Sequence, residues 1–193
     1  SPMKTRWLVP RKSRFLLVLA HGAGAGMDHP WLECLAQALS QEGIATLRFQ
    51  FPYMERGSKR PDAPAVAVQA VEKAVQLARR KYPKLALFAR GKSFGGRMTT
   101  TAASLGKLAG VNGIVCFGFP LHPPKKPSVT RAEHLNDVKL PMLWLQGTRD
   151  DLADLRFVRR TVKKHRKRLT LHKVEGADHG FSVLKSSRRT PED

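Results

Sequence analysis

Short apolar runs alternate along the chain with longer stretches whose apolar residues recur at helical spacing. The short runs predict strands at residues 5–9, 15–20, 44–49, 85–89, 114–117, 142–146 and 169–174. Brief, nearly continuous apolar runs are typical of strands buried in a parallel sheet, and helical stretches between them are typical of crossover connections. The pattern therefore predicts an α/β protein with a mostly parallel sheet and helices on both faces.

The helical stretches predict the elements that cover this sheet. The first helix is expected to begin at Pro30 and to end before Gly43, and Asp62 is expected to cap the second. Their apolar stripes are Trp31, Leu35, Ala38 and Leu39, and Val68, Val71, Val75 and Ala78. A third helix is expected to follow the turn at 91–96 and to run to about Leu105. A fourth has the apolar face Leu152, Leu155, Val158 and Val162, and the start of a last one is expected at Phe181, Val183 and Leu184.

Length and composition indicate a single domain. At 193 residues the chain can bury a core without disulfide or metal support, and no linker divides it, so one domain over residues 1–193 is expected. The Pro-rich connection at 118–138 is too short for a lid domain, and the apolar run at 15–20 is too short to span a membrane. Cys34 and Cys116 have no spacing that suits zinc, and both are expected to be reduced, buried thiols of a cytoplasmic protein.

The charge balance is the most unusual bulk property. Thirty-five Lys and Arg residues face 15 Asp and Glu residues, which gives a formal net charge of +20. A field of this sign attracts anions without specifying a partner. Basic residues concentrate on the polar face of the fourth helix, at Arg156, Arg159, Arg160, Lys163, Lys164 and Arg166. Because no helix-turn-helix, RNA-recognition or zinc-finger signature accompanies them, specific nucleic-acid binding is not expected.

A candidate nucleophile lies between a predicted strand and a predicted helix. Residues 91–95 read Gly-Lys-Ser-Phe-Gly and fit the G-x-S-x-G pattern, which requires this strand-turn-helix context. Glycines flank the serine because the turn is tight and the helix must approach the sheet closely. The pattern predicts that Ser93 stands exposed above the edge of the sheet, where its hydroxyl can attack a carbonyl.

A serine hydroxyl needs a base within hydrogen-bond reach, and the base needs an acid that fixes its tautomer. Asp150 follows the strand at 142–146 and His179 follows the strand at 169–174, so the order along the chain is serine, acid, histidine. Each lies at the carboxyl end of a strand, where open α/β sheets place their sites. Asp151 and Asp154 are better explained by the start of the next helix, and the Asp178 side chain is expected to diverge from its neighbour His179.

Acyl transfer also requires hydrogen-bond donors for the developing oxyanion. The backbone N–H of Phe94, the residue after the nucleophile, is one expected donor. The loop His21-Gly22-Ala23-Gly24 follows an early strand and is similar to the HGGG-type motif, which makes the N–H of Ala23 the other. Neither this loop nor Gly91-Lys92-Ser93 has the glycine spacing of a phosphate-binding loop.

Taken together, these segments resemble small lid-less α/β-hydrolases of the dienelactone-hydrolase-like group. The nearest resemblance is to the testis-expressed and NSL-complex-subunit hydrolase-like proteins and their bacterial homologues. The stretches that carry it are 21–26, 48–53, 91–97, 147–150 and 178–179. The resemblance implies the α/β-hydrolase fold and the triad Ser93, Asp150 and His179, but no substrate. Dienelactone hydrolases proper have cysteine where this chain has Ser93, so their lactone substrate is not carried over.

These observations predict a serine hydrolase that cleaves an ester, thioester or related acyl bond through an acyl-enzyme on Ser93, with no metal or organic cofactor. Lys92 and Arg97 flank the nucleophile in sequence, so an anionic small-molecule acyl substrate is expected. A catalytically idle interaction protein that binds nucleic acid or other polyanions is the alternative, and an acyltransferase or peptidase would use the same residues. A short last helix would leave sheet surface for further residues or for a second copy in a homodimer.

Overall fold

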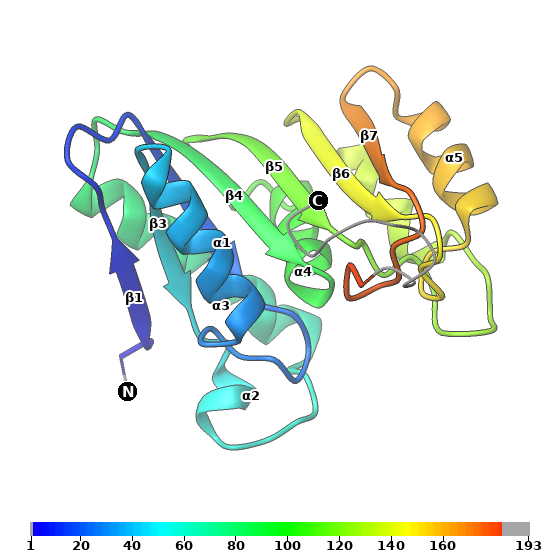
Figure 1. Cartoon of the computed structure of the whole chain (residues 1–193), viewed down its shortest axis with the longest axis horizontal. Helices are drawn as coiled ribbons and strands as arrows, with labels where there is room; N and C mark the ends of the chain where they lie inside the picture. Colours follow the sequence, from blue (N-terminus) through cyan, green and yellow to red (C-terminus); the bar gives the residue numbers. More distant parts are fainter. Residues whose placement is uncertain (1, 183–193) are drawn as a thin grey trace.

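Seven strands form one sheet in the order β1-β3-β2-β4-β5-β6-β7, as Figure 1 shows for the computed structural model, which describes residues 2–182. Their bounds are β1 Thr5–Leu8, β2 Phe15–Ala20, β3 Ile44–Phe49, β4 Ala86–Lys92, β5 Val111–Phe117, β6 Met142–Gly147 and β7 Leu169–Val174. The edge strand β1 pairs antiparallel with β3, and every other pair is parallel. The predicted mostly parallel sheet is confirmed.

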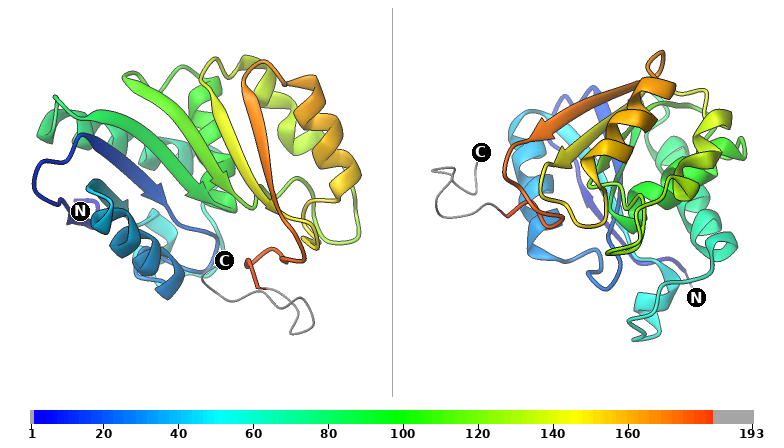
Figure 2. Two further views of the ribbon diagram at one scale, coloured as in Figure 1. Left: turned by 45° about the horizontal axis from the view of Figure 1, so that its top comes forward. Right: turned by 90° about the vertical axis from the view of Figure 1, so that its right-hand side faces the viewer.

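Helices cover both faces of the sheet. They are α1 Pro30–Gln41, α2 Pro52–Glu55, α3 Pro64–Lys81, α4 Phe94–Ser104, the 3₁₀ helix η1 Thr130–Asp137 and α5 Leu155–Lys164. In Figure 1, α1 lies in front of the sheet while α3 and α4 lie behind it, and the right-hand view of Figure 2 separates α1 from α3 and η1 in the same way. Crossovers between parallel strands are right-handed, so the direction in which the chain moves across the sheet decides the face on which the connecting helix lies. Among the parallel strands, only the step from β2 to β3 leads toward β1, and every later step leads the other way.

The main core lies between the sheet and the α3–α4 layer. Small and β-branched residues on α3 allow close approach to the strands, and the buried side chains of this helix are Ala67, Val68, Ala70, Val71, Ala74, Val75 and Ala78. Trp144 on β6 stacks on Phe119 with ring centroids 4.4 Å apart, and both are fully buried. A smaller cluster packs α1 onto β2, where Leu32 and Ala36 meet Leu17 and Leu19. Packing on both faces holds the strands in place, and the carboxyl ends of the parallel strands lie at one edge of the sheet.

Several sequence-based expectations about the helices are wrong in detail. On α1 the fully buried positions are Leu32 and Ala36, whereas Ala38 is exposed, because the helix is rotated about its axis relative to the predicted stripe. The same rotation leaves Cys34 exposed, while Cys116 is buried as expected and burial raises the pKa of its thiol to about 12. Asp62 does not cap α3, whose N-cap is Ala63.

Asp62 has another partner, since its Oδ2 accepts a hydrogen bond from the Tyr53 N–H, 3.0 Å away, at the start of α2. Leu152 precedes α5 and is not part of it, because the helix begins only after its N-cap, Asp154. The predicted last helix does not begin at Phe181, which lies in a bend, and Val183 and Leu184 lie outside the described residues. Within residues 2–182, no helix has both the length and the apolar character needed to cross a membrane.

Candidate active site

The turn at Ser93 joins β4 to α4 with a single residue. Ser93 has a φ of 52° and a ψ of −119°, and its N–H donates to the Phe117 carbonyl, 2.8 Å away. A Cβ on Gly91 would lie 2.2 Å from the Gly96 nitrogen, and a Cβ on Gly95 would lie 2.5 Å from the Ala20 carbonyl oxygen. Only glycine fits at these two positions. The tight turn that the glycines allow holds Ser93 at a positive φ, a backbone conformation that is energetically unfavourable for residues other than glycine.

Ser93, His179 and Asp150 form a continuous chain of hydrogen bonds. The Ser93 Oγ lies 2.7 Å from His179 Nε2, and His179 Nδ1 lies 2.7 Å from Asp150 Oδ2. A carboxylate accepts hydrogen bonds, so the histidine donates from Nδ1 to Asp150 and accepts from the serine hydroxyl at Nε2. The Asp150 side chain is fully buried and that of His179 is 22% exposed, so the imidazole lies at the surface of the site.

The carboxylate of Asp150 is held by two further donors. The Leu152 N–H donates to Oδ1 at 2.8 Å, and the amide Nε2 of Gln146 donates to Oδ2 at 2.8 Å. Gln146 is fully buried at the end of β6, and its Oε1 accepts from the Phe119 N–H, 3.1 Å away. Sequence reasoning missed this residue. The available signal was a glutamine at the end of an otherwise apolar strand.

The loop after β2 passes directly beside the nucleophile. A Cβ on Gly22 would lie 3.7 Å from the Ser93 Cβ, and the exposed Ala23 follows it. Within the described part of the chain, neither the Ala23 nor the Phe94 N–H donates a hydrogen bond to another protein group. The structure therefore leaves both predicted oxyanion donors unused beside Ser93.

Side chains from the end of β3 and from α2 hold this loop. The Gly24 N–H donates to Tyr53 Oη at 3.1 Å, and the Met27 N–H donates to Gln50 Oε1 at 2.8 Å. Arg48 donates to the Met27 carbonyl at 3.2 Å and forms an ion pair with Glu33, so it supports the loop. Burial raises the pKa of Tyr53, which keeps its phenol protonated.

His21, missed as a supporting residue, fixes the other end of the loop. The Phe51 N–H donates to His21 Nε2 at 3.0 Å, and His21 Nδ1 donates to the Gly22 carbonyl at 2.8 Å. This arrangement requires the neutral ring, and burial lowers the pKa of His21 accordingly. A histidine placed directly before a Gly-rich loop was its only sequence signal.

The remaining acids near the site have local roles. Asp154 caps α5, with its Oδ1 accepting from the Arg156 N–H at 2.9 Å, as expected. Asp178 Oδ1 accepts from the Gly180 and Ser182 N–H groups at 3.0 and 2.9 Å, which stabilises the turn after His179. Asp151 is exposed in the turn before α5. None of the three takes the place of Asp150 beside the histidine.

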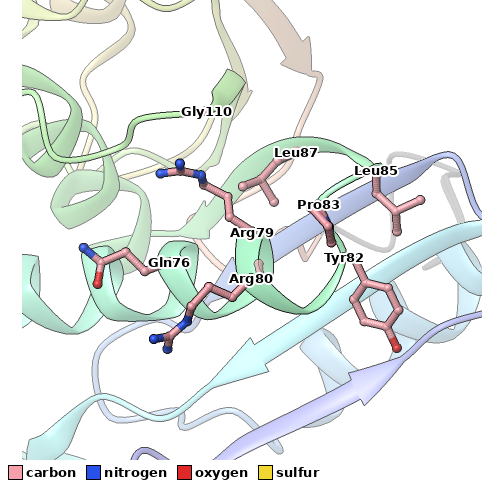
Figure 3. Close-up of a pocket in the computed structure, with 9 residues that line it drawn as sticks. Gln76, Arg79, Arg80, Tyr82, Pro83, Leu85, Leu87 and Gly110 are labelled. Carbon is pink, nitrogen blue, oxygen red and sulfur yellow. The ribbon is translucent and has the colours of Figure 1, made fainter.

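A sizeable hollow among the described residues lies away from this site. It has a volume of about 500 Å³ and lies where α3 ends and β4 begins, the opposite edge of the sheet from Ser93. Figure 3 shows Arg79 directed toward Gly110 and Arg80 directed to another side of α3, and Leu85 and Leu87 also line the hollow. No serine, cysteine or histidine lines it. A far smaller cavity, about 10 Å³, adjoins the loop at Gly22 and Lys92.

Comparison with known proteins agrees with this fold. A family model described as an alpha/beta hydrolase domain matches residues 13–193, and the chain belongs to this family. A serine hydrolase without a lid from Xanthomonas campestris is 20% identical, with a TM-score of 0.75 over 93% of this chain and 81% of that one. The dienelactone hydrolase from Anabaena variabilis is 21% identical, with a TM-score of 0.73 over 93% and 83% of the two chains.

A third similar structure is a cold-adapted esterase from an Arctic intertidal metagenomic library. It is 18% identical, with a TM-score of 0.70 over 94% of this chain and 81% of that one. At these identities the likeness establishes the lid-less α/β-hydrolase fold, as predicted.

Proposed function

We propose that this protein is a serine hydrolase that cleaves an ester, thioester or related acyl bond through an acyl-enzyme on Ser93. The observation that carries the proposal is the hydrogen-bonded chain from Ser93 Oγ through His179 to Asp150, with both contacts at 2.7 Å. This geometry gives the serine a base and gives the base a fixed tautomer. Membership of the alpha/beta hydrolase family and the serine hydrolase and esterase structural neighbours support a hydrolytic role.

In the proposed reaction, His179 Nε2 takes the proton of Ser93 while Oγ bonds to the substrate carbonyl carbon. The carbonyl oxygen becomes an oxyanion, which accepts hydrogen bonds from the Ala23 and Phe94 N–H groups. The protonated His179 then gives its proton to the leaving group as the acyl bond breaks. His179 then takes a proton from water, which attacks the acyl-enzyme, and gives that proton to Ser93 Oγ as the acyl–oxygen bond breaks and the free acid leaves. Asp150 stabilises the imidazolium throughout.

Because the fold has no lid domain, we expect the catalytic edge to be shallow and open, which favours small acyl groups or the end of a larger substrate. The closer resemblance to the testis-expressed and NSL-complex-subunit hydrolase-like proteins is also part of this proposal. It rests on the five sequence stretches described above, of which 21–26, 91–97 and 178–179 lie at the catalytic edge.

One observation favours a second function, binding of a polyanion. Eight Lys and Arg residues lie between 156 and 168, and among residues 2–182 only Arg156 of these eight forms an ion pair, with Asp154. Non-specific attraction to phosphate requires only such charge. The apolar face of α5 is used in packing, with Val158 buried, so no apolar anchor accompanies the charges.

Hydrolysis of short p-nitrophenyl esters tests the proposed function. We expect turnover by the wild type and a loss of at least about a thousandfold in kcat for Ser93→Ala and His179→Ala, since triad members act as a unit. Ser104→Ala, at the far end of α4, is the matched control and should retain activity. Turnover that survives in Ser93→Ala would contradict the proposal. Salt-sensitive retention on DNA without esterase activity would favour the polyanion-binding function.

A further inference from the structure

Two half-buried arginines lie on the α4–η1 side of the catalytic edge. Arg97 is one helical turn after the nucleophile, and its N–H donates to the Ser93 carbonyl at 3.1 Å. Long side chains on a helix lean toward its N-terminus, so we expect Arg97 to be directed back along α4 toward the edge that carries Ser93. Lys92 does not share this location, because its ammonium lies over the Trp31 ring of α1, 4.3 Å from the centroid.

Arg131 reaches the same edge from η1. Its Nη1 lies 3.5 Å from the carbonyl oxygen of Pro120, in the loop that follows β5, and Gly118 of this loop packs against the His179 ring. The helices η1 and α4 are joined by a contact of 2.8 Å between His134 Nε2 and Thr100 Oγ1. Arg131 lies three residues before His134, and Arg97 lies three residues before Thr100. The two arginines therefore lie about one turn before this contact, on two helices that pack together.

No carboxylate of the described residues neutralises the two guanidinium groups. Among residues 2–182, no ion pair involves Arg97 or Arg131. Burial and then the positive charge of Arg131 lower the pKa of Arg97, as expected for two like charges close together in a partly desolvated place. His134 adds no charge at neutral pH, because burial and then Arg97 lower its pKa to about 4.

We propose that Arg97 and Arg131 form an anion-binding subsite, so that the substrate of this hydrolase carries a carboxylate or phosphate group near its scissile acyl bond. This inference rests on the proposed function. Two like charges held together without a counterion repel each other, and a bound anion replaces that repulsion with charge-assisted hydrogen bonds. The planar guanidinium suits bidentate binding of either group. The subsite selects substrates by their charge, whereas a shallow catalytic edge selects little by shape.

Paired ester substrates test the subsite. For an anion on the acyl side, p-nitrophenyl hemisuccinate is compared with the neutral p-nitrophenyl butyrate. For an anion on the leaving-group side, 4-acetoxybenzoate is compared with 4-acetoxybenzamide. In at least one pair we expect wild-type kcat/KM to favour the anionic ester by about tenfold or more at low salt, the size of one charged hydrogen bond. Added salt should reduce this preference.

Variants separate the subsite from the catalytic groups. Arg97→Gln and Arg131→Gln should each remove most of the preference while turnover of the neutral ester changes little, and Arg97→Lys should restore part of it. Arg79→Gln, in the hollow at the opposite edge, is the matched control and should leave the preference intact. No preference in either pair, or a preference that persists in both glutamine variants, would overturn the subsite while neutral turnover still upholds the hydrolase. Absence of turnover for all four esters would overturn both.

Discussion

Gln146 and His179 share one oxygen of Asp150. The Gln146 amide nitrogen and the His179 Nδ1 lie 2.8 and 2.7 Å from Asp150 Oδ2. The same glutamine accepts the Phe119 N–H through its Oε1. A single buried side chain therefore connects the acid of the triad to the loop after β5, so the position of Asp150 depends on β6 as well as on its own turn.

Replacement of Gln146 by leucine should impair both catalysis and folding. Asp150 loses one donor and the Phe119 N–H loses its acceptor, so we expect kcat to fall about tenfold and the free energy of unfolding to fall by about 1–3 kcal/mol. Ester hydrolysis and urea denaturation measure the two effects. Gln76→Leu, at an exposed position on α3, is the control. An unchanged kcat in Gln146→Leu would show that Asp150 needs no help from β6.

Tyr53→Phe should lower kcat with little change in KM. The variant keeps the ring that packs against Phe51 and Phe94 but removes the acceptor for the Gly24 N–H. The loop that carries Ala23 is then held less firmly, and we expect a loss of about fivefold to tenfold in kcat, roughly the worth of one hydrogen bond. Tyr82→Phe provides the control, because Tyr82 packs on Trp7 at the far end of α3. Equal effects of the two substitutions would rule out this role.

His134 should make stability depend on pH. Its pKa is lowered to about 4 in the folded protein, so the unfolded chain, with an ordinary histidine pKa near 6.5, binds the proton more readily. The stabilisation is complete above about pH 6.5 and is lost as pH falls toward about 4. Urea denaturation at pH 7 and pH 5 should show a smaller difference for His134→Gln than for wild type, by about 1 kcal/mol after allowance for partial exposure.

The exposed His172 on β7 offers a matched substitution. His172→Gln should leave the difference between the two pH values close to that of wild type. If His134→Gln has the same pH dependence as wild type, the buried ring does not carry the effect.

The fold and the meeting of Ser93, Asp150 and His179 were predictable because each has a local signal. The glycines around Ser93 enforce a turn that only one architecture uses in this way, and Asp150 and His179 follow apolar runs that are recognisable as strands. In a parallel sheet the carboxyl ends of strands lie at one edge, so these local signals also imply that the three side chains meet. Their hydrogen-bond geometry required the structure.

The supporting residues were not predictable in the same way. Gln146 accepts from the Phe119 N–H, 27 residues away, and His21 accepts from the Phe51 N–H, 30 residues away. Nothing in the local sequence pattern identifies a partner at such a separation. Aspartate is a common helix cap, yet the Asp62 carboxylate accepts a hydrogen bond from the Tyr53 N–H instead of capping α3. Cys34 was expected to be buried and is exposed, for the same reason that the predicted apolar stripe of α1 was wrong. A small rotation of a helix about its axis changes which side chains are buried.

The most direct test of the account is labelling with a fluorophosphonate probe, followed by intact-mass measurement. An activated serine attacks the probe and retains it, whereas an ordinary surface serine does not. We predict one label per wild-type chain and none on Ser93→Ala or His179→Ala, with circular dichroism showing that all three proteins are folded. A folded wild-type protein that takes no label would contradict the assignment of Ser93 as a nucleophile and favour the polyanion-binding function.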